Sequence, residues 1–332
     1  MKTKGTICLA ICLVFFGISA LQAQELEFVD TPDGKHGLKY KDGAVVIPAK
    51  YDDFSLPKGN LAAVKLNDKW GFVDVMNGGN EVVAPKYESA GDLIDGLAAV
   101  KLNGKWGFIN RTGKEIVPPK YDEAGDVVDG AARVILGGKW GFVDYTGKEI
   151  VAPKYQREDN FYDGMATVQL NGKWGCVDLT GKEVVAIKYD DASQFHDGLM
   201  RVLLNGQQIF VDKTGKEIFA SKYPATGDFS EGFAMVSVDK KYGFIDKTGK
   251  EITAIKYDFV DDFSEGLAVV GVGEKYGFID KTGKEVIPLQ FGSIYPVDES
   301  AKDKRYGFYD GTMKVWMDGR AFYIDKTGKE VK

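Results

Sequence analysis

The chain repeats a short aromatic and glycine motif at a nearly constant interval. The motif is Lys-Trp-Gly-Phe or a close variant, and it stands at residues 69–72, 105–108, 139–142, 173–176, 241–244 and 275–278. The spacing is 34 residues from Trp106 to Trp140, from Trp140 to Trp174 and from Tyr242 to Tyr276. A fixed period of this size is typical of a solenoid, a propeller or another array of small units. It constrains the fold more strongly than any local pattern does.

Two positions of the motif recur in every clear unit. The aromatic positions are Trp70, Trp106, Trp140, Trp174, Tyr242 and Tyr276, and the glycines that follow them are Gly71, Gly107, Gly141, Gly175, Gly243 and Gly277. Alternation along a strand places Trp106 and Gly107 on opposite faces. A strand glycine lets another backbone or a ring lie close, and we expect Gly107 and its copies to accept a ring from a neighbouring unit. We expect the Trp and Tyr rings to form the core between units, since large aromatic residues commonly carry core burial.

The third unit shows how one repeat is expected to fold. Residues 96–102 predict a strand, and Asn103-Gly104 favours a two-residue hairpin turn because both turn positions need positive φ. Residues 105–110 predict the returning strand, and a second hairpin leads to a third strand at 114–117. Pro118-Pro119 is expected to end the pairing, since proline has no N–H to donate. Each unit is thus predicted to be a three-stranded antiparallel meander.

The units add up to one all-β array. Counting degenerate copies, residues 24–332 hold about nine units, with degenerate ones at 34–50, 190–222 and 291–332. We expect an open, twisted superhelical stack. A closed β-propeller is the alternative, although 34 residues are few for a four-stranded blade, which usually takes about 40.

The first 23 residues are typical of a signal peptide. Lys2 and Lys4 precede an apolar run, and small residues close it at Ala20 and Ala23, so we expect cleavage before Gln24. The mature chain is then exported to the periplasm, the cell surface or the medium. It contains no apolar stretch long enough to predict membrane insertion.

The mature composition argues against several kinds of activity. Loss of Lys2 and Lys4 takes the formal net charge from −6 to −8, and an acidic balance argues against nucleic acid as a partner. The two histidines, His36 and His196, lie about five units apart and form no visible catalytic or zinc motif. Cys176 stands in a Phe slot and is expected to be a small buried residue. We therefore expect no enzyme, no cofactor and no resident metal.

An acidic residue precedes a glycine at the end of each linker. These acids are Asp95, Asp129, Asp163, Asp197, Glu231 and Glu265. In register they could hold Ca²⁺ through oxygen ligands. We favour a structural role, in which each acid sets a turn and binds local N–H groups, because no unit has the ligand spacing of a known calcium loop.

The repeat resembles a known family. Lys-Trp-Gly-Phe followed by Ile/Val-Asp, Thr-Gly-Lys-Glu, two apolar residues and Pro is similar to the WG-repeat family of bacterial proteins, also called KWG repeats. The resemblance covers about Gly34 to Lys332. It implies β-rich repeats and frequent export, with no general biochemical activity and no catalytic residues to carry over.

Function is expected where the units differ from one another. Gln207 and Gln208 replace Lys and Trp in the sixth unit, and Trp316 and Arg320 lie in and beside an insertion before the last unit. We expect a non-enzymatic scaffold that binds a protein or an envelope component through a long repeat face. The alternatives are a carbohydrate- or peptidoglycan-binding protein that uses exposed rings, and a hydrolase with a site between linker loops.

Overall fold

The computed structural model describes residues 26–159, 161–296 and 306–331, and it divides into two compact units. One comprises residues 1–164 with 179–182, and the other comprises 165–178 with 183–332. The predicted signal peptide lies outside the described residues. Among the described residues, no helix is long and apolar enough to cross a membrane. The regular structure there is antiparallel β, apart from the short 3₁₀ turn η1 (Val75–Asn77).

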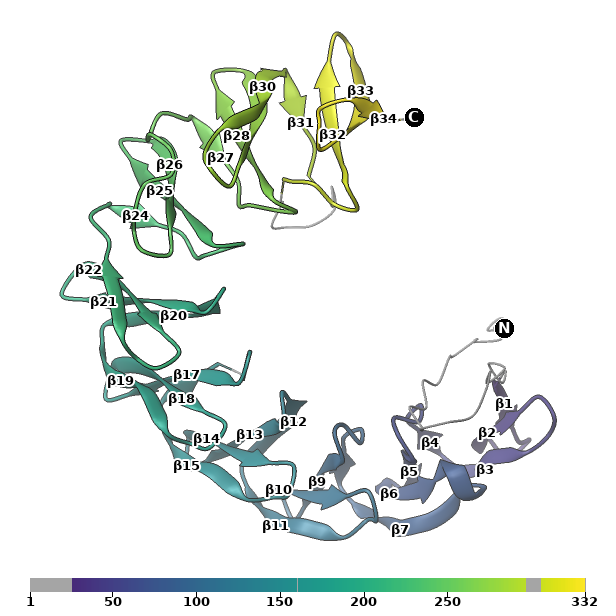
Figure 1. The fold of residues 1–332 in the computed structure, drawn as a ribbon. Coiled ribbons are helices and arrows are strands. Elements are labelled where there is room, and N and C mark those ends of the chain that lie inside the picture. Colours follow the sequence, from purple (N-terminus) through teal and green to yellow (C-terminus); the bar gives the residue numbers. More distant parts are fainter. Residues whose placement is uncertain (1–25, 160, 297–305, 332) are drawn as a thin grey trace, which may run out of the picture. The chain divides into compact units, whose positions relative to one another are not determined.

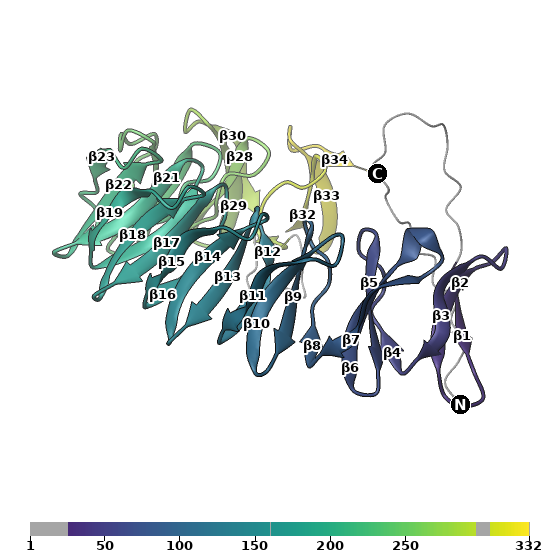
Figure 2. The same ribbon diagram turned by 90° about the horizontal axis from the view of Figure 1, so that it is seen from below.

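The first unit contains three complete four-stranded sheets and one three-stranded sheet. Its strands are β1 (Leu26–Asp30), β2 (His36–Tyr40), β3 (Val45–Tyr51), β4 (Asp53–Phe54), β5 (Leu61–Leu66), β6 (Lys69–Asp74), β7 (Asn80–Tyr87), β8 (Ser89–Ala90), β9 (Leu97–Leu102), β10 (Lys105–Asn110), β11 (Glu115–Tyr121), β12 (Glu123–Val128), β13 (Ala131–Leu136), β14 (Lys139–Asp144), β15 (Glu149–Tyr155) and β16 (Arg157–Glu158). The sheet orders are β1-β2-β3, β4-β5-β6-β7, β8-β9-β10-β11 and β12-β13-β14-β15. Within this unit the sheets follow one another in chain order (Figure 2).

The second unit continues the same pattern. Its strands are β17 (Met165–Leu170), β18 (Lys173–Asp178), β19 (Glu183–Tyr189), β20 (Asp191–His196), β21 (Leu199–Leu204), β22 (Gln207–Asp212), β23 (Glu217–Ala220), β24 (Ala225–Thr226), β25 (Phe233–Val238), β26 (Lys241–Asp246), β27 (Phe259–Val260), β28 (Leu267–Val272), β29 (Lys275–Asp280), β30 (Glu285–Phe291), β31 (Ser293–Ile294), β32 (Thr312–Met317), β33 (Arg320–Asp325) and β34 (Glu330–Val331). The strands within each sheet are joined in sequence, so every sheet is a meander (Figure 1).

The predicted repeat is confirmed, and the structure adds a strand to it. In the third repeat the three expected strands are β9, β10 and β11, and the short linker strand β8 pairs with β9. Asn103 and Gly104 take φ of 52° and 74°, as the hairpin turn between β9 and β10 requires. The all-β tandem array of the sequence analysis is therefore confirmed.

The third strand does not end at the prolines. Phe108 pairs with Val117 and Trp106 pairs with Tyr121, so β11 bulges through Pro118-Pro119-Lys120 opposite the single residue Gly107. A Cβ on Gly107 would lie 2.4 Å from the Val117 carbonyl oxygen. Both expectations for this region are wrong: the prolines lie inside the bulged strand, and the backbone of the same repeat occupies the space that we assigned to a neighbour's ring.

The core lies between successive sheets. One cluster combines Phe108, Val117 and Tyr121 of the third repeat with Val134 and Val143 of the fourth. The largest fully buried side chains are tyrosines from the ends of the third strands and phenylalanines from the motif, including Tyr87, Tyr121 and Phe108. Trp106 is only partly buried and packs against the edge of its cluster. The tryptophans thus lie at the margin of the core. The expectation that they form its centre is wrong, because phenylalanine, tyrosine and valine side chains occupy that place.

A polar contact accompanies this packing from one repeat to the next. The Tyr87 hydroxyl donates to Glu115 Oε1 over 2.7 Å, and the Tyr121 hydroxyl donates to Glu149 Oε1 over 2.6 Å. Burial raises the pKa of each tyrosine hydroxyl, so it remains a donor. Lys86 and Tyr87 lower the pKa of the Glu115 carboxyl through hydrogen bonds. Glu115 and Glu149, each at the end of a Thr-Gly-Lys-Glu or equivalent segment, therefore tie their repeats to the buried tyrosine of the repeat before.

The close approach at Gly107 can be tested with a matched glycine. We expect Gly107→Ala to lower the free energy of unfolding by about 3 kcal/mol, because the methyl group must displace β11 backbone. Gly125→Ala in β12 should change it by less than about 0.5 kcal/mol, since its Cβ would lie 3.7 Å from its nearest neighbour. Urea unfolding with hydrogen exchange over residues 105–121 measures both. Equal stability of the two variants would contradict the assignment.

Candidate functional site in the sixth repeat

The sixth repeat lacks the bulge opposite the motif glycine position, although a register shift remains between Phe210 and Val211. Ile209 stands where other repeats have the motif glycine, and its side chain leaves no room for a bulged backbone. Phe210 pairs with Phe219 and Ile209 pairs with Ala220 without extra residues between them. Ser221 N then donates to Gln208 O over 2.8 Å, beyond the end of β23. One substitution in β22 therefore changes the path of the next strand.

The sixth repeat lacks both residues of an ion pair that the third repeat contains. In the third repeat Lys105 binds Asp122, and Asp122 also accepts from Gly137 N over 2.7 Å. The corresponding residues of the sixth repeat are Gln207 and Pro224. Gln207 Nε2 instead donates to Ser221 O over 3.0 Å. Both charges are absent together, so neither partner is left uncompensated.

An open depression of about 430 Å³ lies at the surface beside these residues. It is lined by Asn205, Gly206, Gln207, Gln208, Ser221, Lys222, Tyr223 and Pro224. Gln208 Oε1 is buried, and it has no hydrogen-bond partner within the part of the chain that the structure describes. Lys222 Nζ lies 3.0 Å from Glu251 Oε1, so its charge is paired. The structure thus brings Gln207 and Gln208, both predicted as contact residues, to one largely neutral pocket.

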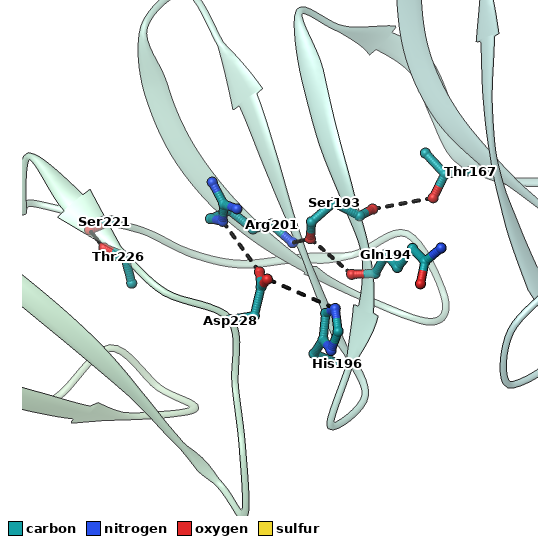
Figure 3. Close-up of polar contacts among 8 residues, drawn as sticks. All are labelled: Thr167, Ser193, Gln194, His196, Arg201, Ser221, Thr226 and Asp228. Carbon is teal, nitrogen blue, oxygen red and sulfur yellow. Dashed lines mark hydrogen bonds and ion pairs between the residues drawn. The ribbon is translucent and has the colours of Figure 1, made fainter. Parts of the chain in front are cut away.

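A second polar cluster lies on the linker side of the same repeat (Figure 3). Arg201 Nε donates to Asp228 Oδ1 over 3.4 Å, and His196 Nε2 lies 3.8 Å from Asp228 Oδ2. Ser193 Oγ donates to Gln194 O and accepts from Arg201 N, so it serves the backbone. The side chains of Arg201, His196 and Asp228 are each about one-third exposed or more, and solvent weakens their pairing. The cluster joins the sixth repeat to the linker of the seventh.

The predicted contact residues of the last repeat lie in a different sheet. Trp316 on β32 is 39% exposed, and its ring lies against the backbone of Gly292. The Arg320 guanidinium donates two hydrogen bonds to Glu330, over 2.6 Å and 2.5 Å, and lies over the Phe322 ring. Arg320 thus holds the end strand in place, and neither residue reaches the pocket of the sixth repeat.

The linker acids take the structural role. Each has a positive φ, as a turn requires: Asp95, Asp129, Asp163, Asp197, Glu231 and Glu265. In the second unit they also reach the next repeat, where Glu231 accepts from Gly266 N over 2.8 Å and lies 3.3 Å from Lys281 Nζ. In the described ranges, no group of three or more His, Cys, Asp or Glu residues could hold a metal ion. The predicted turns are confirmed, and the bonds between repeats were not foreseen.

The repeat geometry agrees with the family comparison. The model of the WG containing repeat matches eight consecutive segments: residues 41–70, 71–106, 106–140, 140–174, 174–207, 210–242, 242–276 and 276–300. The chain belongs to the WG-containing repeat family. The predicted resemblance is therefore confirmed over most of the chain. The comparison with curated proteins gives no match.

Solved structures resemble this WG-repeat protein only weakly. A eukaryotic initiation factor is 11% identical, with 92% of this chain and 96% of that chain covered, at a TM-score of 0.38. Hsv2p of Kluyveromyces lactis is 10% identical, with 69% and 92% covered, at 0.33. PorZ, a surface component of the type-IX secretion system of Porphyromonas gingivalis, is 10% identical, with 83% and 45% covered, at 0.28. No functional conclusion follows from similarities this low.

The first unit of the WG array holds a buried carboxylate that the sequence analysis missed. Glu158 occupies a position at which neighbouring repeats have Ala90, Ala124 and Ala192. Its side chain is 1% exposed, and neither oxygen has a hydrogen-bond partner among the described residues. Arg133 Nη1 lies 3.5 Å away, too far for a well-formed hydrogen bond. Burial raises the pKa of Glu158 to about 7. Alignment of the repeats at their period would have exposed this residue as an exception.

Glu158 should make stability depend on pH in the neutral range. Its pKa is higher in the folded chain, so the folded state holds the proton more tightly and stability falls as pH rises through about 5 to 7. We expect Glu158→Ala to stabilise the protein at pH 8 by on the order of 2 kcal/mol, with the gain vanishing near pH 5. Thermal unfolding at several pH values measures this.

The matched control for this experiment is Glu123→Ala in β12. Glu123 is exposed, so its replacement should leave the pH profile unchanged. A pH-independent effect of Glu158→Ala, or an equal effect of both substitutions, would contradict the assigned role of the buried carboxylate.

Proposed function

We propose that the chain is an exported, non-enzymatic scaffold that binds a protein or an envelope component. The observation that carries this proposal is the coordinated change in the sixth repeat. That repeat keeps residues that build the sheet, including Phe210 and Tyr223, which are buried. It changes the residues that line the pocket, Gln207, Gln208 and Pro224. A repeat that keeps its framework and opens a pocket at its surface is suited to ligand recognition.

The state of the most reactive side chains supports a binding role over catalysis. The Cys176 thiol is fully buried, and burial raises its pKa to about 12, so it stays protonated and a poor nucleophile. Ser193 Oγ is engaged with backbone groups. Asp228 bridges Arg201 and His196 on the surface. Each of these groups has a structural use in the fold.

An envelope glycan is the second candidate ligand. The motif tryptophans are partly exposed at the margin of the core, and cationic side chains lie beside them. Lys101 Nζ lies 5.8 Å from the Trp106 ring, and the Arg133 guanidinium lies 4.7 Å from the Trp140 ring. A row of ring edges flanked by hydrogen-bond donors suits a polysaccharide, although these donors also hold the rings in place.

Capture from the cell envelope tests the proposed function. A chain that begins at Gln24 is immobilised and exposed to fractionated envelope, with the heat-unfolded chain as control. We expect enrichment of one protein, detected by mass spectrometry, or of a polysaccharide, detected by sugar analysis and displaced by free sugar. The first result supports a protein partner and the second an envelope glycan. Equal recovery on folded and unfolded chain would overturn the proposal.

Export is tested by the N-terminus of the protein made in bacteria. We expect the full chain to leave the cytoplasm with Gln24 as its first residue, as N-terminal sequencing of the extracytoplasmic fraction would show. Leu13→Arg interrupts the apolar run and should leave the protein uncleaved in the cytoplasm. Cytoplasmic protein that retains Met1 in the unaltered chain would refute export.

A further inference from the structure

We propose that one edge of the fourth and fifth repeats is a docking surface for a basic segment of a partner protein. The surface consists of four exposed apolar or aromatic side chains and one exposed carboxylate: Val128, Tyr145, Tyr162, Leu179 and Asp129. All five residues belong to the first compact unit. This inference rests on the proposed scaffold function and deepens it by naming the chemistry of the partner.

The fold brings the linker turn and the second hairpin turn of a repeat to the same edge. In the fourth repeat Ala131 pairs with Asp144, and this pairing sets the linker turn that precedes Ala131 beside Tyr145. In the fifth repeat a Cβ on Gly164 would lie 3.9 Å from Leu179 Cδ1. The side chains of the surface therefore come from turns that are neighbours in the folded repeats.

Later repeats place a lysine where this surface has an apolar residue. Lys247 lies fifty residues after the linker acid Asp197, and its Nζ is 2.8 Å from Asp197 Oδ1. Leu179 lies fifty residues after Asp129 and so occupies the position of that lysine. The same pairing of a linker acid with a lysine of the next repeat joins Glu231 to Lys281 and Glu265 to Lys326.

The substitution leaves the charge of Asp129 available to another molecule. Its carboxylate is exposed, and among the described residues it has no ion-pair or hydrogen-bond partner. Asp95 stands in the same position one repeat earlier, but Arg111 Nε lies beside its turn, 3.1 Å from where a Cβ on Gly96 would be. Asp129 is therefore the stronger site for a cation, and a partner's lysine or arginine can bind it as the chain's own lysines bind the later acids.

The apolar part of the surface is specific to these two repeats. Tyr145 is 62% exposed and Tyr162 is 56% exposed. The positions equivalent to Tyr162 in the next three repeats hold His196, Ser230 and Ser264. Exposed apolar side chains that gather on one edge are typical of interaction sites, and tyrosine is enriched in them. The two rings can pack against the aliphatic stem of a lysine or arginine and against apolar residues next to it.

The charge of the chain favours a basic partner over a second copy of itself. The formal net charge is −6, so two copies repel one another. The lysines of the corresponding edge in later repeats, such as Lys247 and Lys281, are already bound to linker acids of their own chain. A basic segment is attracted by the whole chain as well as by Asp129, and this attraction also speeds its association.

Selection of peptides tests the chemistry of the partner. The chain from Gln24 is panned against a display library of random short peptides, and the enriched peptides are synthesised and titrated by calorimetry. We expect them to contain a lysine or arginine next to aromatic or aliphatic residues. Their affinity should fall as salt is added, because the ion pair with Asp129 is exposed.

Two variants test the place of binding. Leu179→Lys supplies the lysine that later repeats hold at this position, and it should weaken binding of a selected peptide by about tenfold or more. Asp129→Asn removes the carboxylate alone and should weaken binding by about two- to fivefold, as expected for an exposed ion pair.

A matched control separates the docking surface from the rest of the repeat. Leu136→Lys makes the same substitution at an exposed leucine at the other end of β13, and it should bind like the unaltered chain. Circular dichroism and thermal unfolding establish that each variant is folded.

Four results would each overturn the inference. They are the absence of enriched peptides, enrichment of peptides without a cation, equal affinity of Leu179→Lys and the unaltered chain, and a dimer in sedimentation that Leu179→Lys dissociates. The last would make a second copy the occupant of the surface.

Envelope capture distinguishes failure of this surface from failure of the scaffold function. If Leu179→Lys captures the same envelope component as the unaltered chain, the docking surface is refuted and the scaffold function stands. If the unaltered chain captures nothing, both fail. Loss of one captured protein in Leu179→Lys, with retention in Leu136→Lys, supports both.

Discussion

The close contact between the motif glycine and the bulged third strand sets the path of that strand in the regular repeats. At Gly107 the Val117 carbonyl comes within 2.4 Å of where a Cβ would lie, so only glycine admits this path. The bulge returns Tyr121 to pairing opposite Trp106 and buries its ring. From there the Tyr121 hydroxyl reaches Glu149 of the following repeat. The sixth repeat has Ile209 in place of the glycine and still makes the equivalent bond from Tyr223 to Glu251, so the glycine determines the path of the strand and not the bond itself.

Repeats without the glycine show what this condition controls. In the sixth repeat Ile209 pairs with Ala220 without the bulge, β23 ends at Ala220, and an open polar depression lies beyond it. In the last repeat Phe322 occupies the glycine position, and β33 pairs with β34 at Tyr323–Val331 and Ile324–Glu330. The scaffold tolerates such changes because each sheet packs mainly against its neighbours. A repeat array can therefore change the surface of one unit while the others maintain the fold.

Part of the candidate site could be predicted because it departs from a visible pattern. Gln207 and Gln208 break the motif, and the structure places both at the pocket. The contribution of Ser221 and Tyr223 could not be predicted, because it depends on the changed path of the strand after Ile209. Trp316 and Arg320 also depart from the pattern, but Arg320 binds Glu330. The equivalent glutamate of a regular repeat, such as Glu115, accepts a hydrogen bond from a tyrosine. Phe291 has no hydroxyl to serve Glu330, and this pairing is visible only when two repeats are compared.

The period, the strands and the turns can be read from the amino-acid sequence, because they depend on residues close together in the chain. Asn103-Gly104 specifies its hairpin through the φ values that both residues adopt readily. The backbone that lies against Gly107, the place of Trp106 at the margin of the core and the burial of Glu158 became visible only in the folded chain. Those outcomes depend on how strands pack against one another within and between repeats. A local pattern of apolar and polar residues predicts which side chains face inward. It does not predict which backbone or side chain they contact.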